Sequence, residues 1–324
     1  MARYPPLSDA TTPLEKAQDL QLPSRTTGGA IIRHPRFREL HARITECWEA
    51  TAAGSEPECL CLIGATGVGK TTLVQSYAAA FPRYETEWGT RSPTLYLETP
   101  HPVTVKGMTA ALLHALGDPR AFKGTQPEMN ARLQGYIADC GVQLVILDDF
   151  HHLIDKQTNR ILRHVSEWLK VLVKNTGVVY VVVGIEGEVE RILDANPQLS
   201  RLFVREYLQP FPWQPDDRTT ITEFARLVSF VQEVLDATMA EEEPVFVSLF
   251  RLHLATSGVM SNILNLFRKA QRIQQRNGLA DQPLTLGVLA QAYSERLLPH
   301  IGRANPFLNP SLFPPSPEEE AAEP

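Results

Sequence analysis

The most specific chemical signal of the sequence is an eight-residue stretch, "GATGVGKT", at positions 64–71. It fits the phosphate-binding pattern G-x-x-x-x-G-K-[ST], and the strand-like run "CLCLI" precedes it as that pattern requires. Glycines allow main-chain N–H groups to surround phosphate oxygens, Lys70 would reach the β- and γ-phosphates, and the Thr71 hydroxyl would ligate Mg²⁺. The alternative is a glycine turn that binds nothing. We expect a nucleotide site formed by Gly64, Ala65, Thr66, Gly67, Val68, Gly69, Lys70, Thr71 and Thr72.

A pair of acids, Asp148 and Asp149, follows the apolar run "LVIL". A buried strand would place Asp148 beside the phosphate loop, where its carboxylate would hold Mg²⁺ through water, and Asp149 would orient the attacking water. The alternative is a strand end with two solvated acids. Many such ATPases carry Glu at the second position, and a positional error near 1 Å costs on the order of a hundredfold in rate. We therefore expect Lys70 and Asp149 to be catalytic and hydrolysis to be slow.

Apolar runs that alternate with helical patterns surround these motifs. Five strands are predicted at "ECLCLIG", "PTLYLE", "VQLVILDDF", "VVYVVVG" and "FVREYLQ". The spacing of apolar residues predicts a first helix from Pro35 and further helices at about 69–81, 105–116, 129–140 and 159–175. Strands bounded by helices indicate an α/β fold whose parallel five-stranded sheet is covered on both faces.

The pattern changes after "PFPWQPDD", where only helices are predicted, at about 216–236, 245–255, 258–277 and 285–296. The four tryptophans of the chain, at positions 48, 88, 168 and 213, are expected to pack. We expect four parts: a flexible leader at 1–29, a nucleotide-binding α/β domain at 30–212, a small helical lid domain at 213–300 and a disordered Pro/Glu-rich tail at 301–324.

One strand, "PTLYLE", separates the two motif strands along the sequence, and no N-K-x-D element that would read guanine follows. This arrangement favours the ATPases with an additional strand over the GTPases. ATP with Mg²⁺ is therefore the expected nucleotide.

Charge and composition exclude little. The net charge of −6 includes Glu318, Glu319, Glu320 and Glu323 of the tail, which leaves about −2 for the rest and neither predicts nor excludes nucleic acid. No apolar run approaches the ~18 residues that a membrane span needs, and no secretory signal is visible. The cysteines show no C-x-x-C pair. We expect a cytoplasmic protein without a membrane partner.

The stretch "NPQLSRLFVREY" places two arginines around the predicted last strand. An arginine just before that strand often projects into a neighbouring subunit's site, where it stabilises charge on the transferring phosphoryl group. We expect Arg201 to act in this way, with Arg205 second, and an arginine in a solvated turn is the alternative. If Arg201 acts so, the active site exists only between subunits of a homo-oligomer.

Six stretches, "IIRHPRF", "GATGVGKTTL", "LVILDDFHHLID", "VVVGIEGEVERI", "QLSRLF" and "SGVMSNILNLFRKAQ", resemble in order the motifs of the AAA+ transposition regulators of the TniB/TnsC family. The resemblance covers about 31–275. It implies an AAA+ ATPase that binds ATP and double-stranded DNA, forms rings or helical filaments on the nucleoid, and links a TniQ-like target selector to a transposase.

The chain departs from the family pattern at three places. The acidic pair is Asp148-Asp149 where Asp-Glu is usual, Gly184 and Ile185 stand where a polar sensor is expected, and "SGVMSN" has no second-sensor arginine. These departures favour an assembly gated by ATP over a motor.

The resemblance also implies where DNA would bind. The stretch that follows the second strand would line a ring interior, which makes Thr104, Lys106 and Lys123 candidates for following one strand of DNA. Contacts to phosphates would give binding without sequence preference. A solvated lysine at a helix start is the alternative for Lys106. The histidines at 151 and 152 are interpreted as structural.

Two other functions fit the same motifs. A helicase loader or origin-binding ATPase would engage a helicase or origin sequences, and a nucleotide-switched signalling ATPase would recruit protein without binding DNA.

Overall fold

The structure, a computed structural model, describes residues 31–52, 56–101, 104–153 and 159–309. The predicted leader at 1–29 and the acidic end of the predicted tail lie outside the described residues. No helix in the described part of the chain is long and apolar enough to cross a membrane.

The chain divides into two compact units, which are described separately below. One falls within Met1–Gly64 and Lys70–Leu208, and the other within Ala65–Gly69 and Gln209–Pro324.

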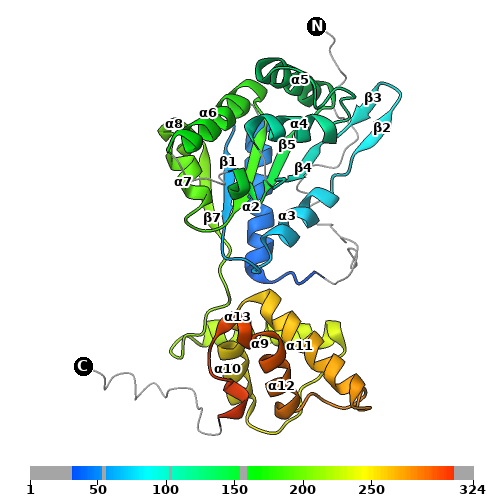
Figure 1. Cartoon of the computed structure of the whole chain (residues 1–324), viewed down its shortest axis with the longest axis vertical. Coiled ribbons are helices and arrows are strands. Elements are labelled where there is room, and N and C mark those ends of the chain that lie inside the picture. Colours follow the sequence, from blue (N-terminus) through cyan, green and yellow to red (C-terminus); the bar gives the residue numbers. More distant parts are fainter. Residues whose placement is uncertain (1–30, 53–55, 102–103, 154–158, 310–324) are drawn as a thin grey trace, which may run out of the picture. The chain divides into compact units, whose positions relative to one another are not determined.

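The first unit is built on a parallel five-stranded sheet (Figure 1). Along the sheet, the order is β4 (Thr94–Glu98), β5 (Leu144–Asp148), β6 (Val179–Gly184), β1 (Cys59–Ile63) and β7 (Phe203–Tyr207). The strand that separates the two motif strands in space is therefore β6, whereas the "PTLYLE" strand, β4, lies at the edge of the sheet. The α/β class and the parallel five-stranded sheet that the sequence predicts are confirmed.

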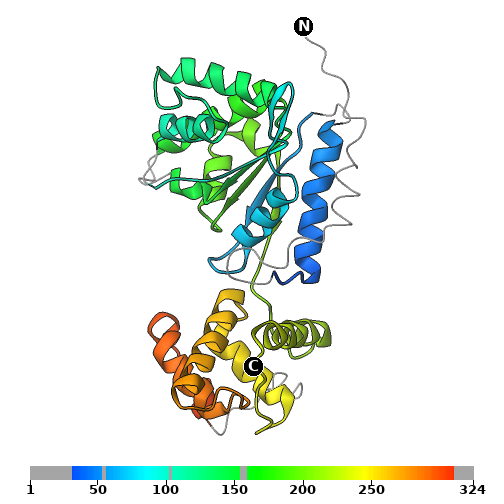
Figure 2. The ribbon, with the colours of Figure 1, turned by 90° about the vertical axis from the view of Figure 1, so that its right-hand side faces the viewer.

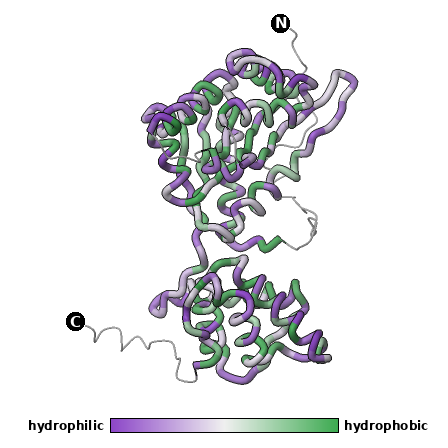
Figure 3. Tube along the Cα trace, in the orientation of Figure 1, coloured by the Kyte–Doolittle hydropathy of each residue, from purple (hydrophilic) through white to green (hydrophobic). Residues whose placement is uncertain are grey.

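Helices cover both faces of this sheet. Alternate strand residues such as Cys61, Val145 and Val182 belong to a core cluster that includes side chains of α4 (Val105–Ala115), α5 (Gln126–Asp139), α6 (Asn159–Thr176) and α7 (Val189–Asp194). The intervening residues, such as Leu62 and Ile146, are equally buried and face the other side, where α2 (Pro35–Ala52) and α3 (Lys70–Ala79) pack. Figure 2 shows α2 on one side of the sheet with α4 and α5 on the other, and Figure 3 shows hydrophobic residues concentrated in the strands.

Helix α2 packs on α3 through aromatic and polar side chains. Tyr77 of α3 contacts Trp48 and Phe81 by its ring and hydrogen-bonds Thr45 at 2.9 Å. His41 lies 3.0 Å from the Ser76 hydroxyl, and burial lowers the pKa of His41 to about 4, so the ring is neutral at physiological pH. This packing fixes the helix that follows the phosphate loop.

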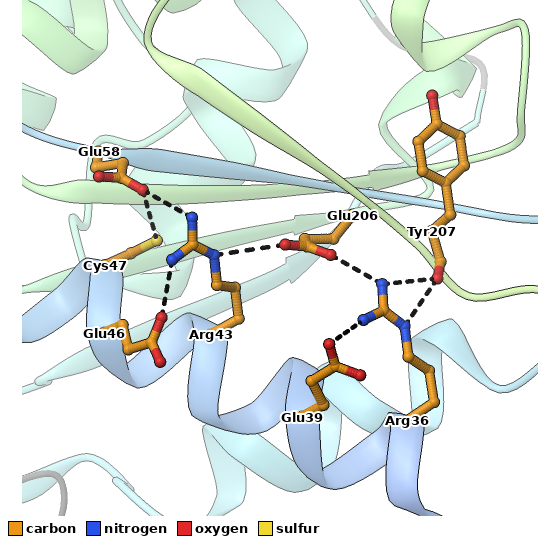
Figure 4. A network of polar contacts seen from close by, with 8 residues as sticks. All are labelled: Arg36, Glu39, Arg43, Glu46, Cys47, Glu58, Glu206 and Tyr207. Atoms are coloured by element: carbon orange, nitrogen blue, oxygen red, sulfur yellow. Dashed lines mark hydrogen bonds and ion pairs between the residues drawn. The ribbon is translucent and has the colours of Figure 1, made fainter.

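Two arginines of α2 also attach it to β7, as Figure 4 shows. Arg36 contacts Glu206 at 2.8 Å and the main-chain carbonyl of Tyr207 at 3.2 Å. Arg43 lies 3.4 Å from the other carboxylate oxygen of Glu206 and also pairs with Glu46 and Glu58. Because one carboxylate of β7 pairs with two guanidinium groups of α2, the position of the helix relative to the strand is fixed.

A two-stranded antiparallel hairpin of β2 (Tyr84–Thr86) and β3 (Gly89–Arg91) follows α3, and the sequence did not predict it. Trp88 lies in its turn with 75% of its surface exposed, so the expectation that all four tryptophans pack is wrong at this position. The strands are only three residues long, which is too short for an alternating pattern to be recognised.

The second unit contains α9 (Arg218–Leu235), α10 (Val245–Thr256), α11 (Met260–Arg276), α12 (Leu286–Arg296), α13 (Leu298–Ile301) and the 3₁₀ helix η2 (Pro306–Leu308). The expected tail at 301–324 begins later than the sequence suggested. Phe307 is buried against the Tyr293 ring, and the guanidinium of Arg251 donates to the carbonyls of Pro306 and Asn309. Residues 301–309 therefore belong to the helical unit, because a buried arginine satisfies their carbonyl groups.

Candidate nucleotide site

Strand β1 leads through the glycine-rich turn into α3, which begins at Lys70. Gly67 and Gly69 have φ values of 84° and 107°, a region in which a side chain is strained, so glycine is required for this path. The ammonium group of Lys70 donates to the carbonyl of Gly64 at 2.9 Å. Burial lowers the pKa of Lys70, an effect that Asp149 and Asp148 oppose. These interactions place the lysine beside the acidic pair.

Asp148 ends β5 as a fully buried carboxylate. It accepts hydrogen bonds from the Tyr96 hydroxyl at 3.0 Å, from the main-chain N–H of Asp149 at 2.9 Å and from the Thr71 hydroxyl. Burial nevertheless raises the pKa of Asp148. Tyr96 is a partner that sequence reasoning missed, because it lies in an edge strand and only the parallel register of β4 and β5 brings it to the acid.

Thr71 and Asp148 suit Mg²⁺. Both offer oxygen ligands, and their hydrogen bond shows that the two side chains meet at one point. Mg²⁺ is usually bound by one or two carboxylates together with substrate phosphates and water. Across the described residues, no group of three or more His, Cys, Asp or Glu side chains is placed to hold a metal ion. One hydroxyl and one carboxylate are a donor set that fits Mg²⁺ bound together with nucleotide phosphates.

Asp149 has a left-handed backbone conformation, with φ of 49°. Its carbonyl accepts from the N–H of His152 at 3.0 Å, which begins the 3₁₀ helix η1 (Phe150–Leu153). Asp and Asn tolerate this conformation better than other residues with a side chain. The chain path at the end of β5 thus favours Asp over the longer Glu that many ATPases carry here.

His151 lies next to this pair and is 8% exposed. Its Nε2 is 3.9 Å from Glu188, and its buried Nδ1 has no hydrogen-bond partner among the described residues. Burial lowers the pKa of His151, so the ring is neutral near pH 7. Its ring centroid lies 4.3 Å from that of His152, with the two rings tilted by 41°, and this packing is compatible with the structural role that the sequence predicts.

Gly184 stands at the end of β6, where a polar sensor was expected. Its carbonyl accepts from the N–H of Gly64 at 3.3 Å, so it adjoins the start of the phosphate loop. A Cβ atom on Gly184 would lie 2.6 Å from the Cβ of Val189, which is fully buried. The first turn of α7 therefore occupies the space that a sensor side chain would need.

The structure distinguishes the two candidate arginines. Arg205 lies in β7 and pairs with Asp194 and Ser200. Arg201 caps the short helix α8 (Pro197–Ser200) and is exposed, and its side chain makes no hydrogen bond or ion pair within the described part of the chain. Arg201 is therefore the arginine that is free to reach another molecule.

The three candidate DNA contacts are all exposed residues of the first unit. Thr104 caps α4, and its hydroxyl oxygen accepts from the N–H of Gly107 at 3.1 Å, which leaves the O–H free to donate. Lys106 lies in the first turn of α4. Lys123 lies in the loop between α4 and α5, and its carbonyl accepts from Arg132 at 2.8 Å.

Comparison with known proteins gives a family and a fold. A family described as "Bacterial TniB protein" matches residues 25–214, more than half of the chain. No curated protein matches.

Among solved structures, the chain is similar to the Orc1 protein of Aeropyrum pernix in complex with DNA, with 18% identity, a TM-score of 0.54, and 86% of this chain and 68% of that chain covered. The Orc2 protein of the same organism, in ADPNP–ADP complexes, has 14% identity and a TM-score of 0.56, with 88% of this chain and 73% of that chain covered. Cdc6p from Pyrobaculum aerophilum has 14% identity and a TM-score of 0.56, with 87% of this chain and 70% of that chain covered. At such identities the similarity shows the fold alone, which is that of the AAA+ ATPases.

Replacing Asp148 by Asn is expected to stabilise the nucleotide-free protein at neutral pH. Because burial raises the pKa of Asp148 above its ordinary value of 3.8, the folded state binds this proton more tightly than the unfolded state. Protonated Asp148 contributes its whole stabilisation when the pH is below its pKa in the unfolded chain. That contribution is lost as the pH rises through its pKa in the folded protein. The stability difference between variant and wild type, measured by urea unfolding, should widen as pH rises above 3.8. A difference that does not change with pH would contradict this.

Replacing Gly184 by Ala is expected to destabilise the protein by about 1–3 kcal/mol, because the new methyl group overlaps Val189. Gly135 is the matched control: it lies inside α5, and a methyl group added there would meet no atom within 4 Å apart from the neighbouring backbone of its own helix, so its replacement by Ala should stabilise by about 0.5–1 kcal/mol. The urea concentrations at the midpoint of unfolding are compared for the two variants and wild type. A midpoint of Gly184→Ala equal to that of wild type would show that α7 can move away from β6.

Proposed function

The chain belongs to the TniB family of bacterial proteins, and from this we propose that it is an ATPase that assembles on double-stranded DNA and links target selection to recruitment of a transposase. The observation that carries the nucleotide part is the contact of the Thr71 hydroxyl with the buried Asp148 carboxylate, beside Lys70. A lysine, a hydroxyl and a carboxylate at the end of a parallel strand are the groups that phosphoryl transfer requires.

In this proposal, residues 64–72 bind ATP, and Lys70 holds the β- and γ-phosphates. Thr71 and Asp148 hold Mg²⁺, which when bound would neutralise charge on the phosphates. Asp149 orients the attacking water. Its carboxylate is one methylene shorter than that of Glu, so turnover is slow and the ATP-bound state persists.

Arg201 supplies the assembly step. Its exposed guanidinium has no partner among the described residues, which supports a role outside its own subunit. ATP favours the assembled ring or filament because Arg201 reaches a neighbour's γ-phosphate only there, and hydrolysis loosens the contact.

Thr104, Lys106 and Lys123 contact the phosphates of one DNA strand without reading sequence. Their exposure supports this assignment. A TniQ-like target selector and a transposase are the protein partners, and the complex acts on the nucleoid in the cytoplasm.

A second function, that of an origin-binding or helicase-loading ATPase, fits the same motifs, and Orc1, whose fold this chain shares, forms a complex with DNA. Binding to random duplex as tight as to any chosen sequence would favour the transposition regulator, and preference for one sequence would favour the origin-type ATPase.

Replacing Lys70 by Ala is expected to abolish ATP-dependent assembly and DNA retention, because the β- and γ-phosphates lose their cation. The test is electron microscopy and sedimentation with random duplex DNA and ATP, ADP or no nucleotide. Lys174→Ala, an exposed lysine of α6, is the control and should behave as wild type. Rings or filaments formed by the Lys70→Ala variant would show that assembly does not depend on nucleotide binding. A wild type that ignores DNA at every salt concentration would indicate the signalling switch.

Mixing two inactive variants tests whether Arg201 acts between subunits. Arg201→Ala retains its nucleotide turn, and Lys70→Ala retains its arginine, so one kind of head-to-tail interface in the mixture keeps both groups: the one that joins the nucleotide turn of an Arg201→Ala subunit to the arginine of a Lys70→Ala subunit. ATPase activity should therefore return in the mixture. The control is a mixture of Arg201→Ala with a variant that carries both Lys70→Ala and Arg201→Ala, which should restore no ATPase activity. Absence of recovery in the first mixture, with each protein folded, would place the action of Arg201 elsewhere.

A further inference from the structure

The loop between α4 and α5 presents an aromatic ring between two cations. Phe122 is 71% exposed, and its closest ring neighbour is His114, with centroids 5.6 Å apart. Arg120 and Lys123 flank it and are exposed. Neither cation makes a side-chain hydrogen bond or ion pair with another described residue, although the charge of Arg120 helps to lower the pKa of Asp118. An apolar ring is thus held at the surface between two exposed cations of the same loop.

The main chain of this loop is fixed from behind by one side chain. Arg132 of α5 donates to the carbonyls of Arg120 and Lys123, at 3.0 and 2.8 Å, and to the Asp118 carboxylate at 3.0 Å. Asp118 in turn accepts from the N–H of Arg120 at 2.8 Å, and Ala121 is buried. The ring therefore needs little further ordering when it binds, and a fixed apolar group loses less entropy on contact than a mobile one.

A third cation belongs to the same surface. Glu128 accepts from the N–H of Thr125 at the end of this loop, at 2.8 Å, and lies close enough to Lys106 for that lysine to lower the pKa of Glu128. Lys106, in the first turn of α4, is thus near Thr125 at the end of this loop, whereas Phe122 lies against His114 in the last turn of α4. A duplex that runs along α4 would meet Thr104 and Lys106 as well as Lys123.

Charge separates Phe122 from the other prominent exposed aromatic residue. Trp88 is 75% exposed, but the acids Glu85 and Glu87 of its hairpin balance the arginines Arg83 and Arg91, and Arg83 lies 3.8 Å from Glu85. A polyanion would gain little there and would be attracted around Phe122. The partner that combines regularly spaced negative charge with apolar, stackable rings is nucleic acid.

We propose that Phe122 enters the minor groove of the bound duplex and partly unstacks one base step, while Arg120 and Lys123 hold the flanking phosphates. This inference rests on the proposed DNA binding and adds that the protein deforms the duplex. Apolar side chains such as Phe insert between base steps from the minor groove and kink or untwist DNA, and a ring on a fixed loop buries its faces only by entering the groove. Binding would then depend on how easily a base step opens, rather than on base identity.

The test compares wild type, Phe122→Ala, Lys123→Ala and Trp88→Ala in the full chain with ATP. Two quantities are measured: affinity for random duplex DNA across a salt series, and the change in linking number of a relaxed plasmid closed in the presence of the protein. The replaced side chains are exposed, and unchanged melting temperatures would establish that each variant is folded.

Wild type should change the linking number. Phe122→Ala should lose most of that change and about tenfold in affinity, with the salt slope unaltered, because the ring carries no charge. Lys123→Ala should keep the linking change while the slope of log K against log salt falls by about 0.9, the value for one lost phosphate contact. Trp88→Ala should match wild type.

Two results would overturn the inference. If Phe122→Ala keeps both affinity and linking change while Lys123→Ala weakens binding, DNA binding stands and insertion of the ring does not. If wild type prefers single-stranded DNA, the ring stacks on separated bases rather than opening a duplex step. Failure of wild type to bind any DNA would instead remove the proposed function, together with the inference that depends on it.

Discussion

A carboxylate buried at the end of a parallel strand is the constraint on which the first unit depends. Asp148 has no exposed surface, and burying an ionisable group is costly unless hydrogen bonds compensate. Three donors offset part of that cost: a hydroxyl from the neighbouring strand, a hydroxyl from the first turn of α3, and the next N–H of the chain. They remain in place only while β4, β5 and the start of α3 keep their register. The requirement of one acid therefore joins three elements that are distant in sequence.

Helix α2 extends this arrangement to the other side of the sheet. Through Tyr77 it contacts the helix that follows the phosphate loop, and through Glu206 it holds the strand that follows Arg201. Helix α2 thus holds both α3, which follows the phosphate loop, and β7, which follows Arg201. In the proposal, the loop would meet nucleotide in its own subunit and Arg201 would meet nucleotide in the next subunit. Under the proposed function, this packing would hold the candidate catalytic groups within the small positional tolerances that phosphoryl transfer demands.

The departures from the usual ATPase pattern have local geometric causes. Asp149 adopts a left-handed conformation in which a short polar side chain is favoured, and Val189 fills the space beside Gly184. Neither departure disturbs the hydrogen bonds around Asp148. Under the proposed function, these changes would affect the step that activates water more than the groups that hold nucleotide.

The sequence by itself determined the fold class, the parallel sheet and the two motifs, because these depend on local patterns: an apolar run, a glycine turn and a helical period. Only the tertiary structure decided the order of the strands, the contact of Tyr96 with Asp148, and the exposure of Arg201 against the pairing of Arg205. It also revealed the short hairpin around Trp88 and the packing of residues 301–309. These features depend on which distant segments meet, and a pattern along the sequence carries no information about a partner that lies 52 residues away, as Asp148 does from Tyr96.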